Sequence, residues 1–127
     1  MDTLLSHLYA VAYAVSDWQR AKKFYGETLG LPVAAFMYDE GGFIEYGAKD
    51  GTHLAINLWR GPGAIPHGEG NAVAIFSVDD VSQTVAELRR RGVRCDEPVI
   101  MPGVVTTAYF YDPDGNRLEL AGPAPQA

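Results

Sequence analysis

Eight short stretches of the chain are rich in apolar and β-forming residues, and turn residues or helices separate most of them, a pattern that is typical of β-strands. The predicted strands cover residues 8–15, 33–38, 43–47, 53–59, 71–78, 94–101, 106–111 and 117–121. Two other stretches carry apolar residues at helical spacing, and each opens on acidic residues that cap free backbone N–H groups, at Asp17 and at Asp80. Gly30 and Gly92 end the two predicted helices.

The predicted elements follow the same order in both halves of the chain: a strand, a helix and three strands. A shift of 63 residues places three positions on their counterparts, namely Ala10, Asp17 and Tyr25 on Val73, Asp80 and Leu88. A repeat of this kind indicates that the fold is built from two similar modules. We therefore predict an α+β fold of two tandem βαβββ modules, whose curled mixed sheets surround a central cavity with the helices outside. The predicted ranges are about 7–60 for the first module, 61–70 for a linker, about 71–121 for the second module and 122–127 for the tail.

The composition limits the possible partners. The chain has 127 residues, 47% of them hydrophobic, which is enough for one packed domain. Its net charge of -6 argues against nucleic-acid and anionic membrane partners and favours a neutral or cationic ligand. No apolar stretch reaches the roughly 18 residues of a membrane span. Cys95 is the single cysteine, so no internal disulfide is possible and we expect a cytoplasmic protein.

A hairpin near the C-terminus carries the candidate functional group. Residues 112–115 (Asp-Pro-Asp-Gly) have the composition of a tight turn and separate two runs rich in apolar residues. After the turn, Leu118 and Leu120 share one face of the predicted strand, while Arg117 and Glu119 share the other. A carboxylate in the middle of a strand faces either water or a cavity. The position of Glu119 therefore decides how the site is interpreted.

Two motifs in the chain resemble those of a known superfamily. The first consists of Val15, Asp17, Ala21, Phe24, Tyr25, Leu29 and Gly30, and the second is the stretch 112–120. Together they resemble the vicinal oxygen chelate superfamily, which includes glyoxalase I, extradiol dioxygenases, fosfomycin-modifying transferases and bleomycin-binding resistance proteins. The resemblance extends over about residues 7–121. It implies the same fold of two tandem modules.

The resemblance also implies where a metal ion would bind. In the metal enzymes of the superfamily, the ligands are a His early in each module, a mid-chain carboxylate and a final Glu. These positions fall on Ala10, on Val73, near Asn57 and on Glu119. A stable divalent site needs three or more donor side chains, and only Glu119 matches the family ligand. We therefore expect no metal and no other cofactor. The less favoured alternative is a site rebuilt from other histidines, namely His7, His53 or His67.

If Glu119 lies on the concave face, as the resemblance implies, strand parity places other candidates on the same face. The ligand-binding candidates are Glu119, Tyr109, Tyr111, Thr107, Asn57, Trp59, His53, Arg117, Ala10 and Val73. Thr107 and Tyr109 also match positions where the fosfomycin transferases place ligand-contacting hydroxyls. Apolar and aromatic walls with a few polar groups are typical of small-molecule sites. The plainer interpretations are that the tyrosines are ordinary strand residues and that Arg117 neutralises Glu119.

Two functions from different classes follow from these residues. The first is a metal-free binding protein that holds a small organic ligand, antibiotic-like or cationic and aromatic, in an aromatic-lined cavity. The alternative is an enzyme of the same superfamily. It is either a metal-free isomerase or cyclase that uses Glu119 and Tyr109 as acid and base, or a metal-dependent lyase or oxygenase with unusual ligands. The sequence favours binding without turnover and leaves the enzyme question open. In either case we expect a homodimer.

Overall fold

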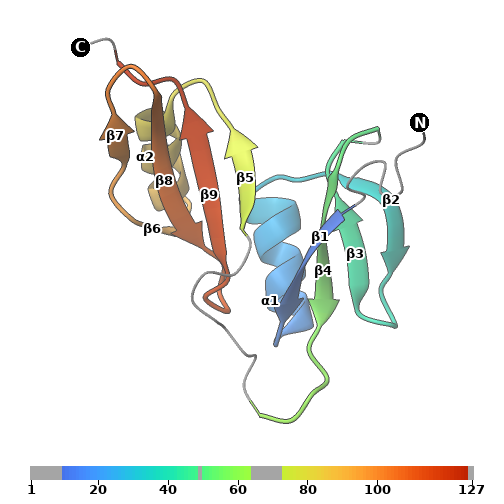
Figure 1. The fold of residues 1–127 in the computed structure, drawn as a ribbon. Helices are drawn as coiled ribbons and strands as arrows, with labels where there is room; N and C mark the ends of the chain where they lie inside the picture. The colour runs from blue at the N-terminus through green and yellow to red at the C-terminus, as the bar shows by residue number, and fades with distance from the viewer. Residues whose placement is uncertain (1–9, 49, 64–72, 126–127) are drawn as a thin grey trace. The chain divides into compact units, whose positions relative to one another are not determined.

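The computed structural model describes residues 10–48, 50–63 and 73–125, with residues 35 and 36 described by their backbone alone. The contacts divide the chain into two compact units, residues 1–65 and residues 66–127. Each unit combines one helical segment with one sheet (Figure 1). Within the described ranges, no helix is long and apolar enough to cross a bilayer.

The first unit contains a four-stranded mixed sheet. Its elements are β1 (Ala10–Val15), α1 (Trp18–Lys22), the π-helix η1 (Lys23–Thr28), β2 (Val33–Tyr38), β3 (Phe43–Tyr46) and β4 (His53–Leu58). The strand order is β1-β4-β3-β2, in which β1 runs parallel to β4 and the other neighbours are antiparallel. The Asp17 side chain caps α1 by accepting a hydrogen bond from the Arg20 backbone N–H.

The second unit repeats this plan. Its elements are β5 (Ala74–Ser77), α2 (Val81–Arg90), β6 (Arg94–Cys95), β7 (Val99–Met101), β8 (Val105–Tyr111) and β9 (Arg117–Gly122). The order is β5-β9-β8-β6, with β7 also paired to β8, and β5 runs parallel to β9. The Asp80 carboxylate caps α2 at the Gln83 backbone N–H, 3.0 Å away. The predicted α+β fold of two βαβββ modules with mixed sheets is thereby confirmed.

Some element boundaries differ from the prediction. The strand predicted over 94–101 is two strands, β6 and β7, and Pro98 lies between them because proline cannot donate to a sheet ladder. Gly122, assigned to the tail, belongs instead to β9, where it pairs with Thr106. The starts of the strands predicted at 8–15 and 71–78, and linker residues 64–70, lie outside the described residues.

The first helical segment contains a π-helix that the periodicity did not predict. The Leu29 N–H donates to the Phe24 carbonyl oxygen, five residues earlier, at 2.8 Å. Gly30 stands thirteen positions after the cap Asp17, whereas Gly92 stands twelve positions after the cap Asp80. Both glycines adopt positive φ, 72° and 83°, and end their helices. The wider π turn accommodates the one extra residue of the first module.

The shift between the modules is therefore not constant, and the prediction of a uniform 63 residues is wrong. The glycines after the helices are related by 62 positions. In the sheets, Ala12 pairs with Ala55 as Ile75 pairs with Glu119. The register thus makes Ala55, two residues before Asn57, the counterpart of Glu119 in the first module.

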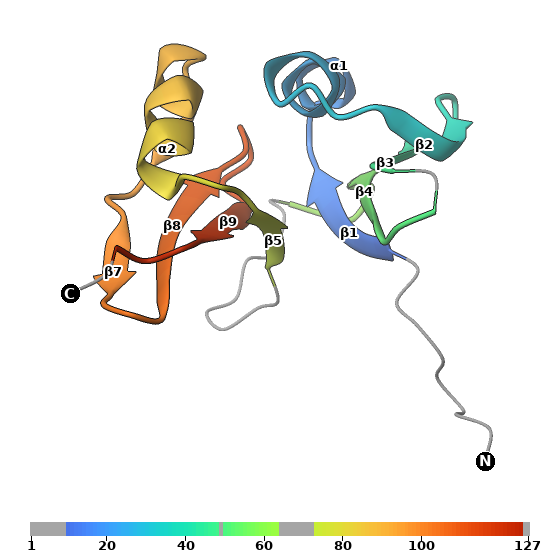
Figure 2. The ribbon, with the colours of Figure 1, turned by 90° about the horizontal axis from the view of Figure 1, so that it is seen from above.

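Each helical segment covers one face of the sheet in its own unit, and the core lies between them (Figure 2). In the first unit the rings of Tyr25 and Tyr46 stack at 6.1 Å, above the buried Ile44 and Ile56. In the second unit, the buried side chains come from α2, β8 and β9: Val81, Val85, Leu88, Ala108, Phe110, Leu118 and Leu120. The apolar residues at helical and strand spacing thus form one packed layer between the helix and the sheet of each unit.

The other face of each sheet carries no helix of its own unit and is called the helix-free face below. In the first sheet it contains Ala10, Ala12, Ala14, Tyr38, Phe43, Glu45, His53, Ala55 and Asn57. In the second sheet it consists of Ile75, Ser77, Arg94, Val99, Met101, Val105, Thr107, Tyr109, Tyr111, Arg117, Glu119 and Ala121. Several polar and ionisable side chains lie on these two faces.

Candidate functional site

The strand register of the second sheet arranges its helix-free face in three rows that cross the strands. The first row is Arg94, Tyr111 and Arg117, the second is Tyr109, Glu119 and Ile75, and the third is Val99, Thr107, Ala121 and Ser77. Directly opposed residues in adjacent strands have Cβ atoms about 5 Å apart. The structure therefore brings five of the sequence-predicted residues together on one face: Thr107, Tyr109, Tyr111, Arg117 and Glu119.

Glu119 lies at the centre of this face. It is half-buried, with Tyr109 opposite it on β8 and Ile75 opposite it on β5. Within the part of the chain that the structure describes, no hydrogen bond or ion pair holds its carboxylate. The neighbouring Leu118 and Leu120 are buried on the opposite face, beneath α2. A rigid strand thus presents an acceptor that a ligand with a hydrogen-bond donor can use.

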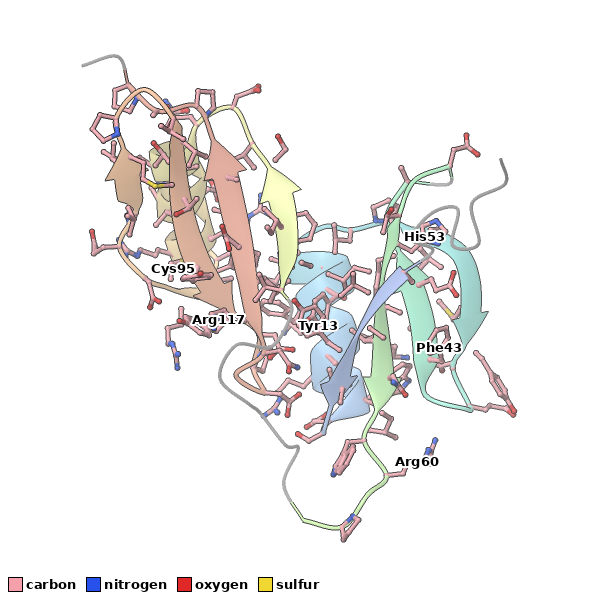
Figure 3. All side chains as sticks on the ribbon, in the orientation of Figure 1. Tyr13, Phe43, His53, Arg60, Cys95 and Arg117 are labelled. Carbon is pink, nitrogen blue, oxygen red and sulfur yellow. The ribbon has the colours of Figure 1, made fainter. Side chains whose placement is uncertain are left out.

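Arg117 contacts an aromatic ring instead of the neighbouring carboxylate. Its guanidinium carbon lies 4.6 Å from the centre of the Tyr109 ring. Figure 3 labels Arg117 on the second unit. Among the described residues no ion pair between Arg117 and Glu119 is found, so the interpretation that the arginine neutralises the glutamate gains no support. A cation above the electron-rich face of a ring is attracted to it. The contact therefore keeps a positive charge beside the phenol.

The two tyrosines of this face differ in the hydrogen bonding of their hydroxyl groups. The Tyr111 hydroxyl donates to Asp96 Oδ2 at 2.6 Å, and Arg94 lies 3.8 Å from the centre of its ring. The hydrogen bond to Asp96 raises the pKa of Tyr111, because it favours the protonated phenol. The hydroxyl of Tyr111 is thus already engaged in a hydrogen bond within the protein. The hydroxyl of Tyr109 has no hydrogen bond inside the described ranges, which leaves it available to a ligand.

The remaining candidates lie elsewhere. Ala10 and Asn57 are on the helix-free face of the first sheet, where Asn57 is exposed. Val73 immediately precedes β5 in the second unit. Trp59 follows β4, and its indole N–H donates to the Gly63 carbonyl oxygen at 3.2 Å.

Glu45 is a polar residue of the first sheet that the sequence analysis missed. Its Oε1 lies 3.1 Å from His53 Nδ1, and both side chains are at most 5% exposed. The second ring nitrogen of His53, Nε2, lies 3.0 Å from the Ala48 carbonyl oxygen. Glu45 stands opposite Ala55 as Tyr109 stands opposite Glu119. Strand parity over 43–47 is the sequence signal that could have placed Glu45 on the same face as His53.

The side chains at the family's metal positions do not fit a divalent ion. Ala10 and Val73 have no donor atom, and the register counterpart of Glu119 is Ala55. His53 is committed through both ring nitrogens, to Glu45 and to a backbone carbonyl. In the described ranges, no group of three or more His, Cys, Asp or Glu side chains is placed to hold a metal. The donor chemistry of this chain therefore departs from that of the metal enzymes.

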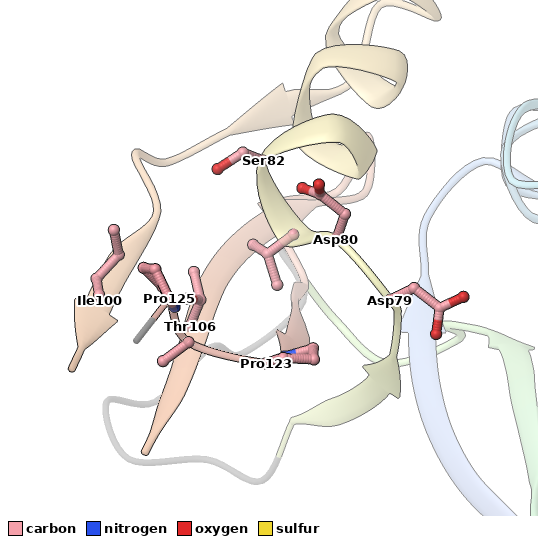
Figure 4. A pocket seen from close by; sticks show the side chains of 9 residues that line it. Asp79, Asp80, Ser82, Ile100, Thr106, Pro123 and Pro125 are labelled. Atoms are coloured by element: carbon pink, nitrogen blue, oxygen red, sulfur yellow. The ribbon is translucent and has the colours of Figure 1, made fainter. Parts of the chain in front are cut away.

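A separate pocket of about 300 Å³ lies at the N-terminus of α2 (Figure 4). It is lined by Asp79, Asp80, Val81, Ser82, Ile100, Thr106, Pro123, Ala124 and Pro125. Asp80 already caps the helix, and Thr106 points to the helix-covered side of its strand. None of the sequence-predicted site residues lines this pocket. It does not belong to the candidate site.

The family model described as the Glyoxalase/Bleomycin resistance protein/Dioxygenase superfamily matches residues 7–120. A probable chloroplastic lactoylglutathione lyase of Arabidopsis thaliana is 33% identical over 128 residues, which cover 91% of this chain and 36% of that protein. The chain thus spans about a third of that relative's length. The uncharacterised protein YaeR of Escherichia coli (strain K12) is 30% identical over 124 residues, which cover 91% of this chain and 95% of YaeR.

Two solved structures show the range of similar proteins. TnmS3, an antibiotic-binding protein from Streptomyces sp. CB03234, is 31% identical with a TM-score of 0.73, over 97% of this chain and 100% of that chain. The trypanothione-dependent glyoxalase I of Leishmania major is 27% identical with a TM-score of 0.69, over 92% of this chain and 86% of that chain. Both a binding protein and an enzyme thus share this fold.

Proposed function

This chain belongs to the Glyoxalase/Bleomycin resistance protein/Dioxygenase superfamily, and from that premise we propose that it binds a small organic molecule without a metal. The binding surface is the helix-free face of the second sheet, centred on Glu119. Binding alone sequesters the molecule, and no chemical step is required. If the ligand is an antibiotic, this sequestration confers resistance.

One observation carries the proposal: among the described residues, neither the half-buried carboxylate of Glu119 nor the Tyr109 hydroxyl on the opposite strand has a hydrogen-bond partner. Both side chains are only partly buried, so their polar atoms remain accessible to a bound molecule. A ligand that donates to Glu119 and stacks on Tyr109 gains a hydrogen bond to a charged acceptor and buries aromatic surface. The likeness to TnmS3, an antibiotic-binding protein, supports the same function.

We further propose that the protein works as a homodimer in the cytoplasm. The single cysteine, Cys95, suits a reducing compartment. Large apolar side chains are exposed along β7 and the turn after it: Val99, Ile100, Met101 and Val104. An exposed apolar edge strand is a surface that a second copy can cover.

The binding proposal is tested with the purified protein and bleomycin as the probe, by calorimetric titration. Denatured samples are analysed by mass spectrometry for a co-purified organic molecule. We expect saturable binding of bleomycin or a stoichiometric co-purified compound, and the substitution Tyr109→Ala to weaken binding at least tenfold. Tyr38→Ala, at an exposed tyrosine of the first unit, is the matched control and should leave binding unchanged. Equal affinity in both variants would contradict the assigned face.

An acid–base enzyme is the second candidate, because Tyr109 and Glu119 are directly opposed on adjacent strands. A carboxylate and a phenol from directly opposed positions can remove a proton from one atom of a substrate and return it to another. The relative from Arabidopsis thaliana, named a probable lyase, favours the same class. The substitution Glu119→Gln separates the candidates. A variant that still binds a co-purified compound but no longer converts it supports the enzyme, and wild-type protein that returns the compound unchanged supports binding alone.

A further inference from the structure

The pocket at the N-terminus of α2 lies outside the face proposed above (Figure 4). Its volume of about 300 Å³ is at the small end of the range for small-molecule sites. Apolar walls come from β7 and from the segment after β9, namely Ile100, Pro123, Ala124 and Pro125. Proline has no N–H to donate. The polar groups of the pocket therefore come mainly from α2 and β8.

Thr106 of β8 is a buried polar residue that the fold leaves without a partner. Its side chain lines the pocket and is 5% exposed. Within the described residues, its hydroxyl makes no hydrogen bond. Every fully occluded side-chain N or O atom of these residues does have a partner, so the Thr106 hydroxyl reaches open space, which the pocket provides. Because buried polar groups are normally hydrogen-bonded, this hydroxyl indicates a bound molecule.

The first turn of α2 supplies further donors to the pocket. The cap already uses two N–H groups, because Asp80 accepts from Gln83 through its side chain and from Thr84 through its carbonyl. The N–H groups of Val81 and Ser82 precede these and have no acceptor among the described residues. The Ser82 hydroxyl has no hydrogen bond there either. A carbonyl oxygen can accept from donors of this kind.

Thr106 and the start of α2 lie close together. Thr106 pairs directly with Gly122 of β9. A Cβ atom at Gly122 would lie 3.1 Å from Val81 Cγ2, so this part of the sheet approaches the first helical turn closely. The hydroxyl and the N–H groups therefore converge on one pocket.

The acceptor in the pocket is the second carboxylate oxygen of Asp80. The cap uses only Oδ1, and Oδ2 has no partner among the described residues. The Asp79 carboxylate is directed away from the other labelled side chains (Figure 4). A ligand carboxylate would be repelled by Asp80, and a ligand ammonium would meet the positive end of the helix dipole. An uncharged group with both an acceptor and a donor avoids both costs.

We propose that this pocket binds an uncharged small molecule through a carboxamide group on an apolar body. The carbonyl oxygen accepts from the first-turn N–H groups of α2 and from the Thr106 hydroxyl, and the amide N–H donates to Asp80. The apolar body packs against Ile100 and the two prolines. This site uses none of the residues of the function proposed above and stands or falls separately from it.

Three benzene probes of similar size test the proposal: benzamide, benzoate and benzylammonium. Each is titrated into the isotopically labelled full chain, and the backbone amide signals are followed by NMR. We expect benzamide to shift the signals of Val81, Ser82 and Thr106 in a saturable way, and each charged probe to bind roughly three- to tenfold more weakly. Thr106→Val replaces the hydroxyl by a methyl group of similar size and should weaken benzamide binding by a similar factor.

Matched variants separate loss of the ligand contact from loss of folding. Because the Thr106 hydroxyl has no partner in the fold, Thr106→Val should not lower the midpoint of urea unfolding, and a lower midpoint would overturn the assignment. Thr52→Val, at an exposed threonine of the first unit, should leave benzamide binding unchanged. Ala124→Phe fills the pocket from the segment after β9 and should abolish binding while the midpoint stays the same.

The position of the shifts distinguishes this site from the face around Glu119. Benzamide shifts confined to Tyr109 and Glu119 would overturn the pocket while supporting the proposed binding face. Equal affinity for the three probes, or no shift at α2 up to the solubility limit of benzamide, would also overturn it. If benzamide saturates the pocket but neither bleomycin nor a co-purified compound binds, only the function proposed above fails.

Discussion

At the scale of single residues, the buried contact between Glu45 and His53 requires a shared hydrogen. A backbone carbonyl only accepts, so His53 Nε2 is the N–H that donates to the Ala48 oxygen. The contact of 3.1 Å between Nδ1 and Glu45 Oε1 then needs one more hydrogen, carried by either atom. The pair fixes the turn between β3 and β4 to the strands on both sides of it.

Removing one partner of this pair should therefore destabilise the protein strongly. We expect Glu45→Ala to lower the free energy of unfolding by about 1–3 kcal/mol, because it removes the contact of the buried His53 Nδ1 with Glu45 Oε1. Glu45→Gln should cost less, since its amide N–H can donate to Nδ1. Urea unfolding at neutral pH measures both. The exposed pair of Arg90 and Glu87 provides the control: Arg90→Gln should leave the unfolding midpoint unchanged. A midpoint for Glu45→Ala equal to that of Arg90→Gln would refute the role.

The candidate site could be predicted from the sequence only where strand parity was sufficient. Parity and the hairpin turn placed Thr107, Tyr109 and Glu119 on one face, since both strands are regular and directly paired. Parity says nothing about how side chains choose partners on that face. The ring contact of Arg117 and the hydrogen bond of Tyr111 depend on rotamers set by three-dimensional neighbours, so the sequence could not distinguish them from a pairing with Glu119.

At the scale of elements, caps and glycines were the reliable signals. Asp17, Asp80, Gly30 and Gly92 lie where the helices begin and end, because side-chain capping and positive φ are local properties. The π-helix was not predictable, since its wider turn depends on packing Phe24 and Tyr25 together against the sheet. The break at Pro98 follows from the missing N–H of proline, and the proline itself was the sequence signal for it.

A polar contact joins α1 to the turn after β2, and it should depend on pH. Asp39 Oδ1 accepts hydrogen bonds from Lys22 Nζ and Trp18 Nε1, each at 2.8 Å, and these bonds lower the pKa of Asp39. A carboxyl with a lowered folded-state pKa stabilises the fold above its ordinary pKa of about 4 and loses this effect as pH falls through the lowered value. We expect the NMR shift of the Trp18 indole N–H to titrate below pH 4 in the wild type.

The matched variant for this titration is Asp39→Asn, whose amide oxygen still accepts a hydrogen bond but does not ionise. The indole signal of this variant should stay constant over the same pH range. A wild-type transition above the ordinary carboxyl pKa would mean that the lysine and the indole do not hold Asp39 as the structure shows.

At the scale of the whole molecule, the proposed homodimer makes a mass prediction. Light scattering should give about twice the 13.8 kDa of one chain. Val104, which is 73% exposed in the turn after β7, is the most exposed large apolar side chain of the described residues. Val104→Lys should shift the mass towards that of a monomer, because an ammonium group is costly to bury in an interface. Gln83→Lys on α2 adds the same charge at another exposed position and should leave the mass unchanged.

The extra residue in the first helical segment has a consequence for tracing the duplication behind this fold. A gapless self-alignment at the offset of the caps equates Glu119 with Ile56, which lies buried beneath the first module's helix. The strand ladders instead equate Glu119 with Ala55. Two indels of opposite sign therefore separate the modules. To infer which acidic residues the ancestral half-domain had, the two modules must be aligned by their backbone pairing. A gapless sequence alignment would exchange the helix-covered and helix-free faces of every strand after the first helix.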